Sequence, residues 1–128
     1  MAGRYSFSKK YRLKKSGDFK LIYQKGHSLA NRGLVLYWLL REDESQKFGI
    51  SVSRKVERKA SRRNRLKRLL REAYRLNRPG LRKGVYLFVI VRAKAKELNF
   101  EEISYSLVSL LRRARLFCDE KTGSKLTA

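Results

Sequence analysis

The sequence predicts a small α+β fold, a two-layer sandwich of helices against a β-sheet. The prediction rests on the order of the hydrophobic patterns, which is helix, two strands, helix, strand and helix. A length of 128 residues suits one domain, which we expect at residues 1–118 with a flexible tail at 119–128. The hydrophobic share of 42% is enough for a modest core.

The first helix is predicted over residues 16–26. Ser16 is a candidate N-cap residue, and Gly26 suits the position after the last helical turn. The i, i+3 and i+4 spacing places three side chains on one face of this helix: Phe19, Ile22 and Tyr23.

Two strands are predicted next, at residues 34–41 and 48–53. The first is a β-prone apolar run in which Tyr37 and Trp38 point to opposite faces. The second alternates, with one face made of Phe48, Ile50 and Val52 and the other of Gly49, Ser51 and Ser53. Because an acidic turn at residues 42–45 joins the two runs, we expect them to form an antiparallel pair.

The second half of the chain predicts a helix, a strand and a helix. The first of these helices should begin at Ser61 or Arg62 and end before Pro79, with an apolar stripe of Leu66, Leu69, Leu70, Ala73 and Leu76. A near-continuous apolar run at residues 85–91 is typical of a central strand covered on both faces. Asn99 is the candidate N-cap of a last helix reaching about residue 117, with a stripe of Ile103, Leu107, Leu110, Leu111 and Ala114.

The charge balance points to a polyanionic partner. Lys and Arg total 33 against 11 Asp and Glu, which gives a formal net charge of +22. Self-repulsion of this size works against compact folding unless an anion offsets it, and nucleic acid is the first candidate. The densest cations lie at residues 54–71, where Glu57 is the only acid.

The second helix should present these cations on one face. Opposite its apolar stripe lie Asn64, Lys67, Arg68, Arg71, Arg75 and Arg78. Its first turn carries Arg62, Arg63 and Arg65, where a helix N-terminus attracts phosphate. The loop before it carries Arg54, Lys55, Arg58 and Lys59. A face that only contacts solvent would mix positive and negative charges, whereas this face places like charges next to one another. The only ion pair expected within the helix joins Arg68 to Glu72. We therefore predict that this face contacts nucleic acid. No short helix precedes it, which argues against a helix-turn-helix reader of DNA.

An aromatic cleft for unpaired bases is a second candidate site. Phe19, Tyr23 and Tyr37 are its candidate rings, since bases stack on such rings at about 1 to 3 kcal/mol each. Packing in the core is the alternative role for all three. Ser51 and Ser53 could floor the same groove, and Trp38 is assigned to packing.

Other functional classes find no support in the sequence. The longest apolar runs are far below the roughly 20 residues of a membrane helix. One cysteine, Cys118, and one histidine, His27 in a predicted loop, cannot build a zinc site. The acids are scattered, so we expect no metal site, no catalytic residue and no small-molecule substrate on this chain. The lone cysteine also favours a reducing, cytoplasmic compartment.

One segment resembles a known signature. The stretch RRNRLKRLLRE at residues 62–72 is similar to the arginine-rich "RNR" signature of the bacterial ribonuclease P protein family. The resemblance extends over residues 11–117, through the segments YRLKKSGDF, SLANRGLVLYWL and FGISVSRKV. The chain departs from the pattern at residues 57–60, where many members have a glycine.

The resemblance implies a fold and a partner. The fold would be an αβββαβα sandwich with a mixed central sheet, a left-handed βαβ crossover and a short extra strand near residues 28–31. The partner would be the catalytic RNA of ribonuclease P, which removes the 5′ leader from precursor tRNA. The protein would raise substrate affinity and support activity at low Mg²⁺, with the Mg²⁺ held by the RNA and none by the protein.

The resemblance also implies roles for individual residues. Together with Arg62, the residues expected to contact the partner RNA are Arg63, Asn64, Arg65, Lys67, Arg68 and Arg71. The residues expected to line the leader cleft are Phe19, Tyr23 and Tyr37, with Ser51, Ser53, Arg54 and Lys55 beside them. The alternative function is a structural RNA-binding protein such as a ribosomal component. A DNA-compacting protein and a stand-alone nuclease are weaker alternatives.

Overall fold

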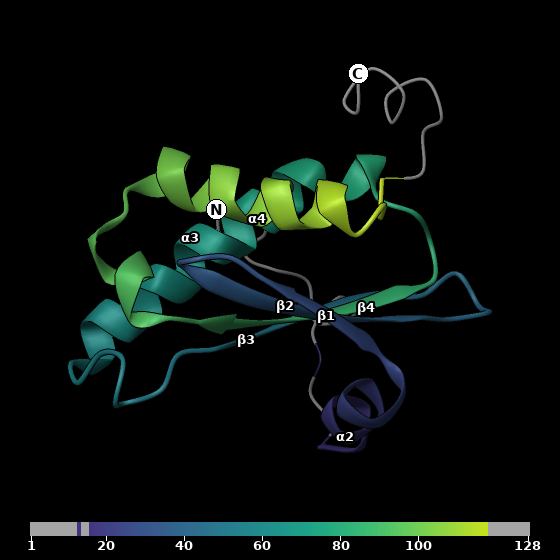
Figure 1. Ribbon diagram of the computed structural model, residues 1–128, viewed down its shortest axis with the longest axis horizontal. Helices are drawn as coiled ribbons and strands as arrows, with labels where there is room; N and C mark the ends of the chain where they lie inside the picture. The colour runs from purple at the N-terminus through teal and green to yellow at the C-terminus, as the bar shows by residue number, and fades with distance from the viewer. Residues whose placement is uncertain (1–12, 14–15, 118–128) are drawn as a thin grey trace, which may run out of the picture.

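The computed structural model describes residue 13 and residues 16–117, so the predicted tail at 119–128 lies outside the described residues. Figure 1 shows the arrangement of the helices and strands. In chain order the elements are α2 (Ser16–Lys25), β1 (His27–Ala30), β2 (Leu34–Leu40), β3 (Gln46–Ser51), α3 (Ala60–Asn77), the 3₁₀ turn η2 (Arg78–Gly80), β4 (Val85–Val91), the 3₁₀ turn η3 (Ala93–Glu97) and α4 (Phe100–Arg113). The order αβββαβα and the α+β class are therefore confirmed.

The sheet has the strand order β1-β2-β4-β3. β4 runs antiparallel to β2 and parallel to β3, so the predicted antiparallel pairing of residues 34–41 with 48–53 is wrong. β4 lies between them because a strand with apolar residues on both faces is buried best in the centre of a sheet, with a strand at each edge and helices over both faces. The acidic segment therefore crosses the width of one strand and does not form a hairpin turn.

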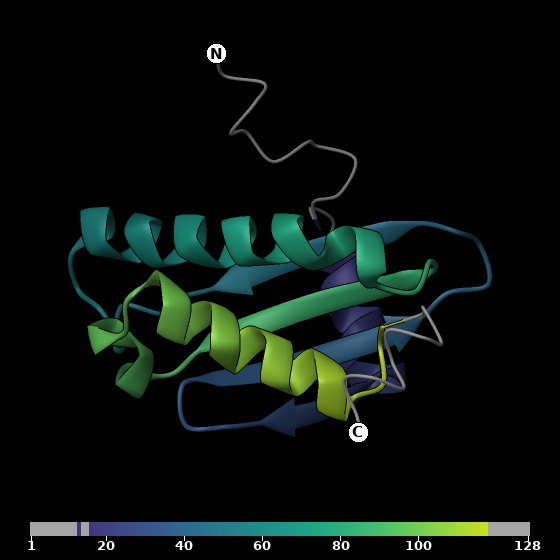
Figure 2. The same cartoon turned by 90° about the horizontal axis from the view of Figure 1, so that it is seen from above.

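The connection from β3 through α3 to β4 is a left-handed crossover, a rare arrangement since almost all such connections are right-handed. In Figure 2 the sheet is viewed from the side of α3. Both strands point to the left, and the chain steps from β3 down to β4. The crossover places α3 over one edge of the sheet, with its N-terminus at the end where β3 and β4 finish.

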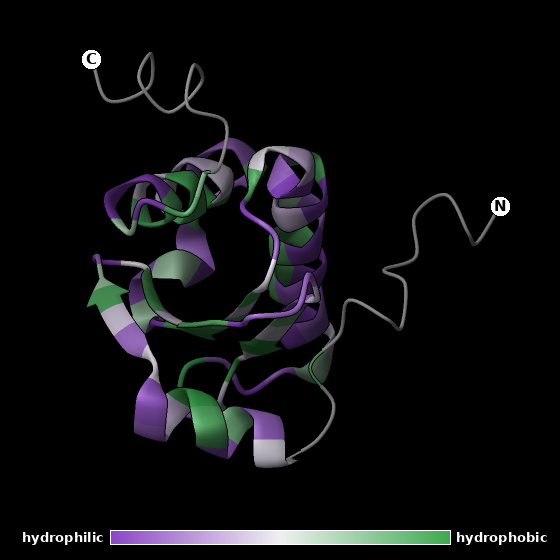
Figure 3. Ribbon diagram, turned by 90° about the vertical axis from the view of Figure 1, so that its right-hand side faces the viewer, coloured by the Kyte–Doolittle hydropathy of each residue, from purple (hydrophilic) through white to green (hydrophobic). Residues whose placement is uncertain are grey.

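Helices cover both faces of the sheet. α3 and α4 pack side by side on one face, and α2 covers part of the other (Figure 3). The larger core lies under α3 and α4 and includes Leu36, Leu70, Leu87 and Leu107, all with no exposed surface. A smaller core under α2 joins Leu13, Ile22, Tyr86 and Phe88. The prediction that β4 is buried on both faces is confirmed.

The helix stripes differ from prediction at two positions. Leu76 is 55% exposed, whereas Tyr74 is fully buried and stacks on Phe48 with ring centroids 4.3 Å apart. Successive helix residues are separated by about 100°, which places Leu76 roughly 100° from the centre of the buried face. Tyr74 is therefore buried in the position that was predicted for Leu76.

α4 ends at Arg113, before the predicted end near residue 117. Arg115 adopts a left-handed conformation with φ of 59°, and the Leu116 N–H donates to the Leu111 carbonyl. This turn brings Leu116 into the core at 1% exposure, and Phe117 then pairs with Leu81. The burial of Leu116 therefore ends the helix.

The predicted cap of α4 is present as a complete capping box. Asn99 Oδ1 accepts from the Glu102 N–H at 2.8 Å, and Glu102 Oε1 accepts from the Asn99 N–H at 3.0 Å. We expect Asn99→Ala to lower the free energy of unfolding by about 1 kcal/mol, measured by urea denaturation. Asn99→Asp, which keeps the acceptor, should remain close to the unchanged chain. An equal loss in both variants would contradict a capping role.

Candidate nucleic-acid interface

α3 separates its charged face from its apolar face, as predicted. Leu66, Leu70 and Ala73 are buried against the sheet and α4. Of the predicted RNA-binding residues, Arg62, Asn64, Arg65 and Arg68 are exposed, and Arg63, Lys67 and Arg71 are half-buried. Figure 3 shows the hydrophilic side of α3 turned away from the sheet. One outer face of the molecule therefore collects most of these side chains.

Acidic partners are scarce on this face. Glu72 pairs with Arg75, whose guanidinium reaches both carboxylate oxygens at 2.9 and 2.6 Å, and this contact lowers the Glu72 pKa. The expected pairing of Glu72 with Arg68 is therefore wrong. Among the described residues, no acid forms a salt bridge with Arg65, Lys67 or Arg68. These cations are available for an external anion.

Arg63 has a different environment from its neighbours. Its Nη1 donates to the Glu57 carbonyl at 3.0 Å and to the Arg58 carbonyl at 2.7 Å. The guanidinium therefore holds the loop that leads into α3. A contact with nucleic acid would have to use its remaining N–H groups.

The loop after β3 continues the basic surface. Ser53, Arg54 and Lys55 are exposed, and Ser53 Oγ accepts from the Val56 N–H at 3.2 Å. The strand ends at Ser51, earlier than predicted, because the Ser53 carbonyl accepts turn bonds from Val56 and Glu57. The backbone thus turns toward the start of α3 at this point.

The three predicted cleft aromatics gather on the α2 side of the sheet. Tyr23 meets Tyr37 edge to face with centroids 5.1 Å apart, and Phe88 lies 4.8 Å from Phe19 and 5.8 Å from Tyr23. Tyr23 is 51% exposed, whereas Phe19 and Tyr37 are partly buried. Burial, and then the nearby Tyr37, raise the pKa of Tyr23, so its ring carries no negative charge.

Phe88 is a member of this cluster that the sequence did not single out. It belongs to the apolar run of β4, where nothing distinguishes it from its neighbours. Tyr37, Phe88 and Gly49 are paired across three strands, and Ser51 lies two residues further along β3. A Cβ at Gly49 would come within 3.2 Å of the Phe19 ring, so the glycine allows α2 to pack closely.

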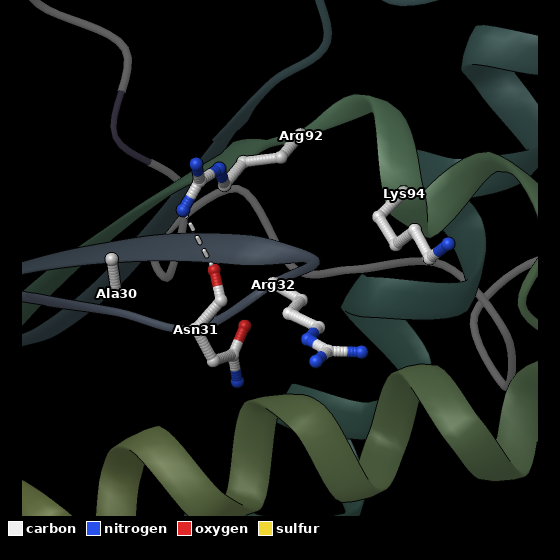
Figure 4. Close-up of a pocket in the computed structure, with 5 residues that line it drawn as sticks. All are labelled: Ala30, Asn31, Arg32, Arg92 and Lys94. Carbon is white, nitrogen blue, oxygen red and sulfur yellow. Dashed lines mark hydrogen bonds between the residues drawn. The ribbon is translucent and has the colours of Figure 1, made fainter.

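A basic pocket lies at the turn after β1, next to the residues that follow β4 (Figure 4). Its lining residues are Ala30, Asn31, Arg32, Arg92 and Lys94. Arg92 Nη1 donates to the Asn31 carbonyl at 2.9 Å, and Asn31 Oδ1 accepts from the N–H groups of Gly33 and Leu34. Since Leu34 pairs with Val91, the turn after β1 lies beside the end of β4. The sequence pattern did not indicate that these cations lie together, because their proximity depends on the register between β2 and β4.

Two residues that the predicted sites do not include lie on the first two strands of the sheet. His27 is in β1, not in the predicted loop, and its ring lies 5.5 Å from that of Trp38. Trp38 packs against the larger core. Cys118 lies outside the described residues.

In residue 13 and residues 16–117, no three His, Cys, Asp or Glu side chains come close enough to hold a metal ion. No helix in that part of the chain has the length and apolar character needed to cross a membrane.

Comparison with known proteins gives one consistent family. The family model described as ribonuclease P matches residues 7–115. The ribonuclease P protein component of Clostridioides difficile is 41% identical over 108 residues, covering 84% of this chain and 94% of that protein. That of Lactobacillus gasseri is 37% identical over 118 residues, covering 91% and 97%.

Solved structures agree with the sequence comparisons. The RNase P protein of Staphylococcus aureus superposes with a TM-score of 0.77 at 38% identity, covering 84% of this chain and 98% of that one. The RNase P protein of Thermotoga maritima gives 0.73 at 37% identity, covering 80% and 96%. These likenesses do not favour the ribosomal alternative.

Proposed function

Because this chain belongs to the ribonuclease P protein family, it is the protein subunit of a tRNA-processing endoribonuclease, and we propose how its surfaces serve that enzyme. The outer face of α3 binds the RNA subunit. The aromatic cluster of Phe19, Tyr23 and Tyr37 receives the single-stranded 5′ leader of precursor tRNA. The protein itself contributes no catalytic residue, and the RNA subunit carries the catalytic centre.

The observation that carries the proposal is the set of cations on α3 without acidic partners. Arg65, Lys67 and Arg68 form no salt bridge with the described residues. Arginine suits this role because its planar fork binds phosphate with two parallel hydrogen bonds. The residues proposed to contact the RNA subunit are Arg62, Arg63, Asn64, Arg65, Lys67, Arg68 and Arg71.

The leader is proposed to follow a path from the aromatic cluster to the end of the sheet. Ser51 lies on the same strand face as Gly49, and Ser53, Arg54 and Lys55 continue toward α3. Beside them, the pocket cations Arg32, Arg92 and Lys94 would contact phosphates further along the strand. Stacking would hold the bases while the cations hold the backbone, with little dependence on leader sequence.

The bond-breaking chemistry is proposed to use Mg²⁺ ions held by the RNA subunit. The contribution of this chain is electrostatic: its net charge of +22 screens the phosphates of both RNAs where they approach each other. Less Mg²⁺ is then needed to offset the same repulsion. A cytoplasmic location is proposed because the single cysteine cannot form an internal disulfide.

Reconstitution tests this function. We expect the chain to stimulate cleavage of precursor tRNA by a bacterial ribonuclease P RNA, strongly at low Mg²⁺ and weakly at high Mg²⁺. Cleavage of the 5′ leader is measured on gels across a Mg²⁺ series, with RNA alone and protein alone as controls. The absence of stimulation at every Mg²⁺ concentration would refute the proposal. Cleavage by the protein without RNA would instead support a stand-alone nuclease.

A further inference from the structure

A buried carboxylate lies where the loop before α3, the first turn of α3 and η3 meet. Glu57 is 6% exposed and is the only buried charged residue in the part of the chain that the structure describes. Its Oε2 accepts from the Lys59 N–H at 3.1 Å, and its Oε1 lies 3.8 Å from Lys96 Nζ. The hydrogen bond from Lys59, and then the charge of Lys96, hold the Glu57 pKa below its usual range. The carboxylate is therefore ionised inside the fold.

The helix beside this carboxylate lacks the usual stabilisation of a helix start. Its N-cap residue, Lys59, makes no side-chain capping bond, and its first turn contains no acidic residue. That turn carries Arg62 and Arg63, whose positive charges oppose the positive end of the helix dipole. α4, in contrast, has both a capping box and two acids in its first turn. Glu57 supplies the negative charge that the start of α3 lacks.

Glu57 also fixes the main chain around that first turn. Its N–H donates to the Ser53 carbonyl at 3.0 Å, and its own carbonyl accepts from Arg63 Nη1 at 3.0 Å. Because Lys96 belongs to η3, which follows β4, the ion pair ties the loop to a second segment at the same end of the sheet. The side chain and main chain of this one residue thus hold three segments together: the loop before α3, the first turn of α3 and η3.

We infer that Glu57 is a positioning residue for RNA binding. Its carboxylate fixes the first turn of α3, so the cations of that turn meet the partner RNA already arranged. This inference rests on the proposed function, since it assumes that α3 binds the RNA subunit. A surface that is ordered before binding loses less conformational freedom on binding, which raises affinity.

Glu57→Gln tests the inference, because positioning and net charge predict opposite changes in RNA affinity. The substitution keeps the size of the side chain and removes one negative charge, so charge alone predicts tighter RNA binding. Positioning predicts the opposite, an affinity for ribonuclease P RNA lower by about five- to tenfold. Binding is measured by fluorescence anisotropy with the full chain at fixed salt.

Glu97→Gln is the matched control. Glu97 is exposed, lines the same small pocket as Glu57 and Lys96, and forms no salt bridge with any described residue. This variant changes the net charge equally without touching the Lys59 N–H. It should bind the RNA as tightly as the unchanged chain, or slightly more tightly.

Two further measurements separate positioning from a loss of folded protein. Glu57→Asp keeps the charge and should recover most of the lost affinity. At saturating protein, the Glu57→Gln holoenzyme should cleave precursor tRNA at the original kcat, with the defect confined to the protein concentration required. A lower kcat at saturation, or binding as tight as that of Glu97→Gln, would overturn the inference. Failure of the unchanged chain to bind the RNA would instead refute the proposed function.

Discussion

Replacing Arg65 and Arg68 together with glutamine is expected to weaken binding to the RNA subunit by about ten- to a hundredfold near physiological salt. Both side chains are exposed on α3, and neither forms a salt bridge with the described residues. Each phosphate contact releases condensed counterions, so the slope of log affinity against log salt should become shallower by about one for each arginine removed.

The same double variant should remain folded. Glutamine has nearly the helix propensity of arginine, and the substitution removes like-charge repulsion from the exposed face. We therefore expect a free energy of unfolding equal to or slightly above that of the unchanged chain. A loss of RNA binding can then be assigned to the interface.

A second charge-matched pair provides the control for net charge. Arg82 and Lys83 are exposed just before β4, at the opposite end of the sheet from the start of α3. Arg82→Gln with Lys83→Gln removes the same two charges, and affinity should fall by less than about threefold. Equal losses in the two double variants would show that total charge, and not the face of α3, determines binding.

The helices and the central strand were predictable because their signals are local. The periodicity of Leu66, Leu70 and Ala73 places α3 correctly on the sheet, and the pattern Asn99 to Glu102 predicts the start of α4. The end of α4 was not predictable in this way, because it depends on the burial of Leu116 against elements distant in sequence.

Strand pairing and part of the site could not be read from local patterns. β4 separates β2 from β3 because of what covers it, and no spacing within residues 34–53 contains that information. The same register brings Arg92 to the turn at Asn31 and Phe88 to Tyr37, so these members of the site emerge only from the assembled sheet. Glu57 was visible as a lone acid among cations, but its burial depends on Lys96 from a later segment.

Tyr37→Ala is expected to weaken holoenzyme binding of precursor tRNA by about tenfold and to leave mature tRNA unaffected. The ring lies on β2, with Tyr23 and Phe88 against it, where an unpaired base could stack. One such stack contributes about 1 to 3 kcal/mol of binding free energy. Mature tRNA has no leader, so its binding does not depend on this stack. Tyr37 is a better target than Phe19, because Phe19 fills the space above Gly49 and its removal would loosen α2.

The comparison of precursor with mature tRNA makes this prediction specific to the leader. A general loss of folded protein or of RNA-subunit binding would lower affinity for both substrates alike. Tyr37→Phe, which keeps the ring, should retain the preference for precursor. Tyr105→Ala removes an aromatic that is 73% exposed on α4, and should also retain it. If Tyr37→Ala weakens both substrates equally, the aromatic cluster does not receive the leader, while the assignment of α3 to the RNA subunit would still stand on its own test.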